Sequence, residues 1–454
     1  MGCVRGTASV ALVALMTSCI RSSAPSGVPL PSGSGPRATS AAAAEPVEFY
    51  REAGFIAAAE DVPFVGAVRF LADRSTDTAY ALIALSFANH SLTFARDGER
   101  YHASYDVALE VRRDTSVLHR SSAHEEVRVG SFKETTRDEE SVIFQRIVAL
   151  PRGEVTIDIA VTDAANGRRG HAATAIVVPG FDNESLGWPI VAYDAAPRST
   201  RAAQPNVVMN PRATVVFGRD SVLAVYLEAY GGIPPFIVRV TAQTLDGHTV
   251  TADTVPMLDR GGLLTGEAKL RVARLGLGLL RVIATRQDGS DAVAVPAVVS
   301  FGEGLVVATF DEMLEYLRYF VSPDRLQALR DATPAQRPAA WMTFVRETDP
   351  NPLTAEQEGL RDYFERIRTA NKRFREPDTP GWTTDRGKVF DVLGEPEEIT
   401  EPVAAPSQRG RTQVWEYRRQ RARFVFVEEG NGERWRLTPS SQAEFDAMLR
   451  RPKP

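Results

Sequence analysis

The first half of the chain alternates apolar and polar residues with a period of two. Apolar side chains occupy every second position of residues 105–111 and again of residues 155–161, and Asp106, Glu110, Thr156 and Asp158 lie between them. Turn signals such as Asp97-Gly98 and Asn166-Gly167 separate these runs. Short strands with one buried face, joined by tight turns, are typical of an antiparallel sandwich. We therefore predict an N-terminal β-sandwich over residues 47–185.

A second region of about 100 residues repeats this pattern. We expect strands there at residues 221–228, 236–244, 279–286 and 292–301. Glycine-containing turn signals lie at residues 231–232, 246–247, 261–262 and 288–289. The length and strand number predict an immunoglobulin-like β-sandwich over residues 198–302. Such sandwiches host many functions, so this prediction concerns architecture alone.

After residue 302 the apolar period changes to that of a helix. Residues 310–317 and 353–374 carry apolar stripes three and four positions apart, and we expect shorter helices at residues 323–330 and 334–347. Three strands and a closing helix are then predicted at residues 413–419, 423–428, 434–437 and 440–449. The expected fold class is multi-domain and mainly β. Two antiparallel sandwiches precede a helical segment and an α+β domain over residues 305–454.

The N-terminus has the pattern of an export signal. Arg5 precedes an apolar run at residues 8–16, and two small residues then lead to Cys19. The run is shorter than the roughly 20 residues that span a bilayer, but it suits a signal peptide. The string at residues 15–19 resembles a bacterial lipobox, which implies a signal peptide at residues 1–18 and a lipid on Cys19.

Two other interpretations of this N-terminus stay open. One is an ordinary secretory signal with an incidental cysteine, and the other is myristoylation at Gly2 with palmitoylation at Cys3. Residues 19–46 are rich in Ser, Pro, Gly and Ala, which predicts a disordered linker. On the lipobox interpretation, the protein is exported, is anchored in a membrane through Cys19, and faces the periplasm or the cell surface.

Composition narrows the possible partners and cofactors. The 454-residue chain is 43% hydrophobic and 24% charged, with a formal net charge of -5. This charge argues against a nucleic-acid partner, which needs a concentrated positive surface. Its 2 cysteines, Cys3 and Cys19, precede the folded part, so we expect neither internal disulfides nor thiolate metal sites there.

The most distinctive string of the chain begins at residue 381. Gly381 permits a tight junction, and Trp382 offers a large apolar anchor. Thr383 or Thr384 can cap a helix at its N-terminus, and Asp385 suits the positive end of the helix dipole. Asp385 and Arg386 are the most tempting functional residues, although a helix cap with a charged first turn is our leading interpretation of both. Gly394 and Pro396 would end the helix.

This string resembles the GWxTD-domain family, whose members are bacterial lipoproteins. The matching residues are Gly381, Trp382, Thr384 and Asp385, followed by Gly394, Pro396, Trp415 and Tyr417. The resemblance implies no known enzymatic activity. We take the motif residues, with Arg386 beside them, as candidates for an interaction site: Gly381, Trp382, Thr384, Asp385, Arg386, Trp415 and Tyr417. The segment from Leu393 to Tyr417 also resembles small envelope-assembly lipoproteins, which share a helix ending in Leu-Gly-x-Pro and a Trp/Tyr-containing meander.

The sequence carries no pattern that predicts catalysis. It has no Gly-x-Ser-x-Gly elbow and no P-loop, and His119 and His124 lack the helical spacing of zinc ligands. The basic stretch at residues 418–423 fits a solvated hairpin turn. We therefore expect no catalytic residue, cofactor or metal.

Our leading hypothesis is a non-enzymatic envelope lipoprotein that binds or scaffolds a protein partner. The alternatives are an exported hydrolase or peptidase accessory with a site in the C-terminal domain, and a polysaccharide-binding envelope protein.

Overall fold

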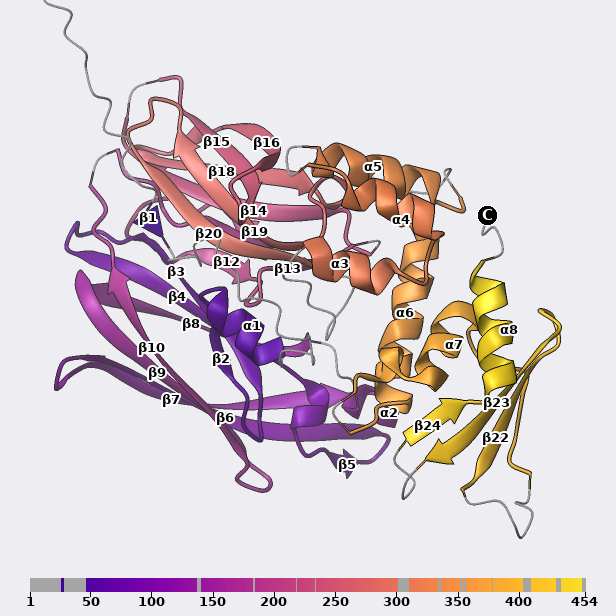
Figure 1. Ribbon diagram of the computed structural model, residues 1–454. Coiled ribbons are helices and arrows are strands. Elements are labelled where there is room, and N and C mark those ends of the chain that lie inside the picture. The colour runs from indigo at the N-terminus through magenta and orange to yellow at the C-terminus, as the bar shows by residue number, and fades with distance from the viewer. Residues whose placement is uncertain are drawn as a thin grey trace, which may run out of the picture.

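The computed structural model describes residues 26–27, 46–136, 140–182, 184–217, 219–232, 234–300, 310–333, 336–351, 353, 357–377, 379–402, 410–429 and 434–450. The predicted signal peptide, Cys19 and nearly all of the predicted linker therefore lie outside the described residues. The fold class expected from the sequence is confirmed, because antiparallel sheets make up the first two thirds of the chain and an α+β part follows (Figure 1).

The first sandwich begins after the short helix α1 (Pro46–Glu52). One sheet contains β2 (Ile56–Ala58), β3 (Phe64–Ala72), β4 (Thr78–Ala88) and β8 (Glu140–Pro151) in that order. The other contains β10 (Arg169–Val178), β9 (Gly153–Asp163), β6 (Arg100–Arg113), β5 (Ala95–Asp97) and β7 (Ser116–Val129). Two short helical turns, η1 (Asn89–Ser91) and α2 (Phe132–Thr135), connect strands of this unit.

The alternation in the sequence explains how these sheets pack. Along β6, the side chains of Tyr105, Val107, Leu109 and Val111 are buried, whereas the residues between them are partly or fully exposed. In the antiparallel ladder, Leu109 lies opposite Ile159 of β9. The apolar face of each strand is therefore directed at the facing sheet.

The second sandwich contains two further sheets. The first comprises β12 (Asn206–Met209), β11 (Ile190–Ala196), β14 (Val222–Tyr230), β18 (Leu263–Arg271) and β17 (Leu258–Asp259). The second comprises β1 (Ser26–Gly27), β20 (Ala292–Ser300), β19 (Gly278–Arg286), β15 (Ile237–Thr244) and β16 (Thr249–Pro256), with β13 (Thr214–Val216) also on β20. The turn η2 (Val272–Arg274) links β18 to β19. β11 precedes residue 198 and pairs with β14, so this sandwich starts earlier than the expected boundary.

The described C-terminal part contains four helices before a junction, then a small sheet and a closing helix. The helices are α3 (Phe310–Leu317), α4 (Pro323–Arg330), α5 (Arg337–Glu347) and α6 (Glu358–Arg373). The junction consists of η3 (Gly381–Thr383) and α7 (Asp385–Leu393). The sheet contains β21 (Glu398–Thr400), β22 (Thr412–Tyr417), β23 (Ala422–Glu429) and β24 (Arg434–Leu437), before the closing helix α8 (Pro439–Leu449).

The helices connect the second sandwich to the small sheet. Helices α4 and α5 lie beside the second sandwich, and α6 leads from them to α7 and the sheet (Figure 1). Trp341 of α5 packs edge-on against Phe217, with ring centroids 5.6 Å apart. Buried apolar side chains form one continuous cluster through both sandwiches and the C-terminal part. Among the helices that the structure describes, none is long and apolar enough to cross a bilayer.

A buried ion pair joins the two sandwiches. Arg198 donates from Nε to Oε1 of Glu228 at 2.9 Å and from Nη2 to Oε2 at 2.7 Å. The hydroxyls of Tyr226 and Tyr230 donate to the same two carboxylate oxygens at 2.9 Å. The link to the first sandwich is Ala72, whose carbonyl accepts from Arg198 at 2.6 Å and whose N–H donates to Tyr230 at 2.7 Å.

The remaining donors of this guanidinium are also engaged. Nη1 of Arg198 donates to the carbonyls of Arg201 and Ala203 at 2.6 and 2.9 Å. The side chains of Arg198 and Glu228 are 1% and 0% exposed, so neither charge is solvated by water. Burial, followed by the charge of Glu228, raises the pKa of Tyr230 well above its usual value. The tyrosine hydroxyls therefore stay protonated and can donate.

We expect Glu228→Ala to lower the free energy of unfolding by about 3–5 kcal/mol, because the variant leaves a buried arginine without its counter-charge. Urea denaturation followed by tryptophan fluorescence measures the change. The matched control is Glu267→Ala on β18, since Glu267 forms an exposed pair with Lys269 at 3.2 Å and should contribute less than about 1 kcal/mol. Equal losses in the two variants would contradict this role for the buried pair.

Candidate functional site

Two glycines allow the motif at residue 381 to form a compact junction. A Cβ on Gly381 would lie 2.1 Å from the carbonyl oxygen of Ala370 in α6. A Cβ on Gly387 would lie 1.8 Å from the carbonyl oxygen of Gly381. Both distances are far shorter than real carbon contacts, so these positions accept no larger residue without a backbone shift. The close approach places η3 directly against α6 and α7.

Trp382 anchors this junction to the preceding helices. Its indole stacks on the ring of Tyr316 with centroids 4.8 Å apart and an interplanar angle of 28°. The guanidinium of Arg318 lies 4.5 Å from the ring centroid of the indole. The backbone N–H of Trp382 donates to Oδ1 of Asn371 in α6 at 3.1 Å. The tryptophan therefore has a packing role, as the sequence suggested.

Thr384 is the residue that caps α7. Its hydroxyl accepts from the N–H of Gly387 at 3.1 Å and donates to the carbonyl of Gly381 at 2.7 Å. Of the two threonines that the sequence offered as caps, Thr384 has this role. Its side chain satisfies one of the free N–H groups at the helix start.

Asp385 connects the start of α7 to the small sheet. Its Oδ2 accepts from the backbone N–H of Leu437, at the end of β24, at 2.9 Å. Its Oδ1 accepts from Nζ of Lys388 one turn along the helix at 3.0 Å. Both oxygens of Asp385 are thus used inside the domain.

Arg386 lies between two aromatic side chains. Its guanidinium carbon is 5.4 Å from the ring centroid of Phe374 and 4.9 Å from that of Trp435. Burial lowers the pKa of this half-buried arginine, while the nearby Glu376 raises it. Nε of Arg386 is buried and has no hydrogen-bond partner in the described part of the chain. Arg386 is therefore held in place mainly by its contacts with the rings of Phe374 and Trp435.

Glu376 is a neighbour of this arginine that the sequence did not single out. It is 2% exposed, and its Oε1 accepts from the N–H of Trp435 at 2.9 Å. Its Oε2 accepts from Nη1 of Arg436 at 3.1 Å. Glu376 thus fixes the strand that carries Trp435, and it adds a negative charge near Arg386.

The two aromatic residues of the motif's second half are buried in the domain core. Trp415 packs against Phe374 and Phe426, with ring centroids 5.3 and 4.8 Å apart, and its Nε1 donates to Gln413 at 2.9 Å. The hydroxyl of Tyr417 donates to the carbonyl of Gly394, just after α7, at 2.9 Å. Gly381, Trp382, Thr384, Asp385, Arg386, Trp415 and Tyr417 therefore belong to one α+β unit, most of them through internal contacts.

The basic stretch of the hairpin between β22 and β23 is balanced by glutamates. Arg418 forms an ion pair with Glu398. Arg419 lies 3.9 Å from Glu397, and Arg423 lies 3.9 Å from Glu416. These arginines are exposed, so the hairpin is a solvated face with both signs of charge.

Asp391 is a buried carboxyl that sequence reasoning did not find. It is 0% exposed, and neither of its carboxyl oxygens has a hydrogen-bond partner among the described residues. Burial raises its pKa to about 8, although Arg366 and Arg318 partly oppose the shift. In the sequence, Asp391 looks like any polar position of a short helix. Only the packing of α6 on α7 reveals its environment.

His119 and His124 of the first sandwich form local and cross-strand contacts. Nδ1 of His124 lies 2.8 Å from Oδ1 of Asp106 on the paired strand. Nε2 of His119 lies 3.0 Å from Oγ of Ser121. Within the ranges that the structure describes, no three His, Cys, Asp or Glu residues converge in a way that could hold a metal ion.

Comparisons with known proteins support the motif and little else. Residues 288–444 match the GWxTD domain, whereas no curated protein matches the chain. Latent PorU of Porphyromonas gingivalis shares 12% identity over 54% of this chain and 20% of its own, with a TM-score of 0.24. The beta-glucuronidase of Bifidobacterium dentium shares 13% identity over 48% and 39%, with a TM-score of 0.17. This chain thus spans well under half the length of either protein. TM-scores this low do not establish a shared fold.

We expect Trp382→Ala to lower the free energy of unfolding by about 3–5 kcal/mol, because it removes a buried indole between Tyr316 and Arg318. Chemical denaturation of the purified chain measures the loss. Trp382→Phe keeps an aromatic ring there and should lose clearly less. A Trp382→Ala protein that unfolds at the wild-type denaturant concentration would rule out the anchoring role.

Asp391 should make stability depend on pH. Its pKa rises from 3.8 to about 8 in the folded protein, so between these values only the folded state binds the proton. Raising the pH through this window therefore destabilises the fold, by about 1.4 kcal/mol per pH unit from this group. Asp391→Asn should remove that slope and should be more stable than the wild type at pH 8. Urea denaturation at pH 6, 7 and 8 tests this, with the exposed Asp362→Asn as control. An unchanged slope in Asp391→Asn would refute it.

Proposed function

We propose that this GWxTD domain-containing protein is a non-enzymatic, membrane-anchored lipoprotein of the cell envelope that binds and positions a partner protein. The N-terminal sequence supports the anchor, since residues 8–16 and Cys19 have the pattern of a lipoprotein export signal. Residues 19–46 are not one disordered linker as expected, because Ser26–Gly27 pairs with β20 of the second sandwich. The stretch from Cys19 to β1 would therefore hold the folded body at most about 25 Å from the lipid.

The binding role is inferred from a difference between Arg386 and the other polar residues of the motif. The polar atoms of Thr384 and Asp385 are engaged inside the domain. Arg386 differs from them, because its half-buried guanidinium lies against two rings and its buried Nε has no hydrogen-bond partner among the described residues. A guanidinium already fixed by its surroundings loses little conformational entropy when it binds a carboxylate. We infer that Arg386 receives an acidic group of the partner.

The rest of the body supports a positioning role. The buried pair of Arg198 and Glu228 fixes one sandwich on the other. The cluster of buried apolar residues then continues into the C-terminal part. A partner that binds at Arg386 would therefore be held at a defined place relative to both sandwiches.

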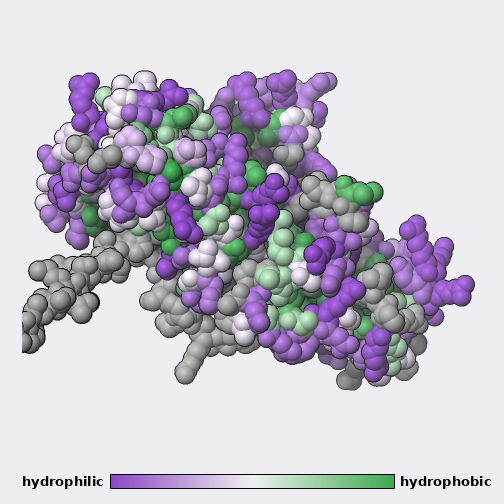
Figure 2. All heavy atoms as spheres, turned by 90° about the horizontal axis from the view of Figure 1, so that it is seen from above, coloured by the Kyte–Doolittle hydropathy of each residue, from purple (hydrophilic) through white to green (hydrophobic). Residues whose placement is uncertain are grey.

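The sequence also left a hydrolase and a polysaccharide-binding protein as alternatives, and neither is favoured by the residues on which it would depend. A hydrolase site built on Asp385 would need a free carboxylate, but both of its oxygens are engaged. Polysaccharide binding would need a strip of exposed aromatic rings, whereas the exposed Phe132 and Tyr193 belong to different sandwiches. On the face shown in Figure 2, hydrophilic side chains dominate and apolar residues form patches between them.

The experiment combines fractionation with crosslinking in intact cells. Wild-type protein should sediment with membranes, and Cys19→Ser should appear in the soluble fraction, because acyl chains on one cysteine give stable anchoring. Crosslinking followed by purification through the C-terminus should recover the same envelope protein in repeated preparations. That complex should be lost in Arg386→Ala.

Arg419→Ala is the matched control, since Arg419 is an exposed arginine of the same domain at 3.9 Å from its partner Glu397. It should retain the complex. Thermal unfolding of purified Arg386→Ala must show that the variant is folded. A complex that persists in folded Arg386→Ala, or a wild-type protein that yields no complex, would overturn the binding proposal. Membrane retention of Cys19→Ser would overturn the anchor alone.

A further inference from the structure

Arg286 occupies a position of the second sandwich that the strand pattern reserves for apolar residues. Along β19, the side chains of Leu280, Val282 and Ala284 are buried. Because alternate residues of a strand share a face, Arg286 belongs to the same inward row. Its residue surface is 6% exposed. A charged side chain is therefore placed at the end of the core between two sheets.

The guanidinium of Arg286 is only partly satisfied. Nη2 donates to the carbonyl of Gly231 at 3.3 Å. Nε lies 3.7 Å from Oδ1 of Asp288, which is an ion pair but too long for a hydrogen bond. Nε and Nη1 have no hydrogen-bond partner in the described ranges. A buried charged donor without a partner is costly, so this arrangement suggests that a ligand completes it.

The adjacent turn is shaped around this side chain. Gly232 has a φ of +113°, and a Cβ at this position would lie 2.1 Å from Nη2 of Arg286. A larger residue would therefore clash with the guanidinium as well as strain the backbone.

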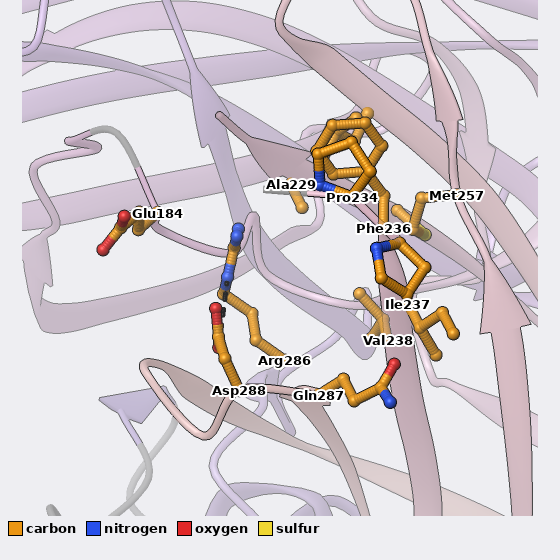
Figure 3. Close-up of a pocket in the computed structure, with 12 residues that line it drawn as sticks. Glu184, Ala229, Pro234, Phe236, Ile237, Val238, Met257, Arg286, Gln287 and Asp288 are labelled. Atoms are coloured by element: carbon orange, nitrogen blue, oxygen red, sulfur yellow. Dashed lines mark ion pairs between the residues drawn. The ribbon is translucent and has the colours of Figure 1, made fainter. Parts of the chain in front are cut away.

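The guanidinium lines a pocket of about 430 Å³, within the usual range for small-ligand sites. Figure 3 shows the guanidinium between Glu184 on one side and an apolar wall on the other. That wall comprises Pro234, Pro235, Phe236, Ile237, Met257 and Leu264. Of the two acids at this pocket, Asp288 also accepts hydrogen bonds from Ser290 at 3.0 and 2.6 Å.

We propose that this pocket binds a single carboxylate carried on an apolar group, with Arg286 as the residue that recognises the carboxylate. Nη1, which has no hydrogen-bond partner among the described residues, can donate to one carboxylate oxygen, and the apolar wall would cover the body of the ligand. The exposed carboxylates of Glu184 and Asp288 disfavour a second negative charge on the ligand. This inference goes beyond the proposed function and does not depend on it, because the pocket lies in the second sandwich.

Two sources would supply this chemistry, namely a free organic acid or the C-terminal carboxylate of a polypeptide. The experiment therefore has two arms, both with the full chain and isothermal titration calorimetry. One arm compares 3-phenylpropanoate with 3-phenylpropanamide. The other compares a tripeptide ending in phenylalanine, as the free acid, with its C-terminal amide. In at least one arm, the acid should bind at least about tenfold more tightly than the amide, because only the acid pairs with Arg286. If 3-phenylpropanoate binds more tightly than the tripeptide acid, the ligand is a free organic acid; the reverse order indicates a polypeptide C-terminus.

Arg286→Met should abolish the preference for the acid. It should also fold, because an apolar side chain replaces a buried charge whose donors are incompletely paired. Arg281→Met, on the opposite face of the same strand, is the matched control and should keep the preference. Ile237→Trp leaves Arg286 intact, fills part of the pocket, and should weaken both acids.

Equal binding of acid and amide in both arms would overturn the proposal. The same holds for a preference that survives in folded Arg286→Met, and for the absence of binding by any of the four probes at millimolar concentration. If Arg286→Met does not fold, Ile237→Trp decides, since undiminished binding of the acids to that variant would exclude this pocket.

Discussion

The arrangement of the β-rich body depends on the buried pair of Arg198 and Glu228. Each carboxylate oxygen accepts from one guanidinium nitrogen and from one tyrosine hydroxyl. The same guanidinium reaches the first sandwich at Ala72. Two charges removed from water are tolerated when every donor and acceptor around them is paired. This pairing requires the ends of β3 and β14 to meet at hydrogen-bond distance, so it holds one edge of each sandwich against the other.

A different constraint organises the C-terminal domain. There the close approach of backbone at Gly381 and Gly387 sets the angle between α6 and α7. That angle lets Asp385 reach the backbone of Leu437, and it places Arg386 beside the ring of Trp435. The motif is thus a set of contacts around one junction. Its glycines allow the close backbone approach, and its aspartate then bonds the strand that this approach brings near.

The sequence predicted what depends on local periodicity. Alternation along β6 and β9 indicated buried faces and hence sandwiches, and the threonines before Asp385 indicated a helix cap, which Thr384 provides. It did not predict what depends on distances between segments. The strand β11 lies in a stretch of weak alternation, and it belongs to the second sandwich only because it pairs with β14. Asp391 has no local signal either, since its burial comes from the packing of α6 on α7.

Arg198 and Arg286 show why burial alone does not identify a functional residue. Both guanidinium groups are nearly inaccessible to solvent. All three nitrogens of Arg198 donate to protein acceptors, so adding a ligand there would break contacts that the fold needs. Arg286 lines a pocket, donates to one carbonyl at 3.3 Å and forms a long ion pair with Asp288, and among the described residues neither Nε nor Nη1 has a hydrogen-bond partner. A fold that merely needed to fill the end of a sandwich would gain more from an apolar residue. The incomplete pairing of Arg286 is therefore better explained by an anionic ligand than by stability.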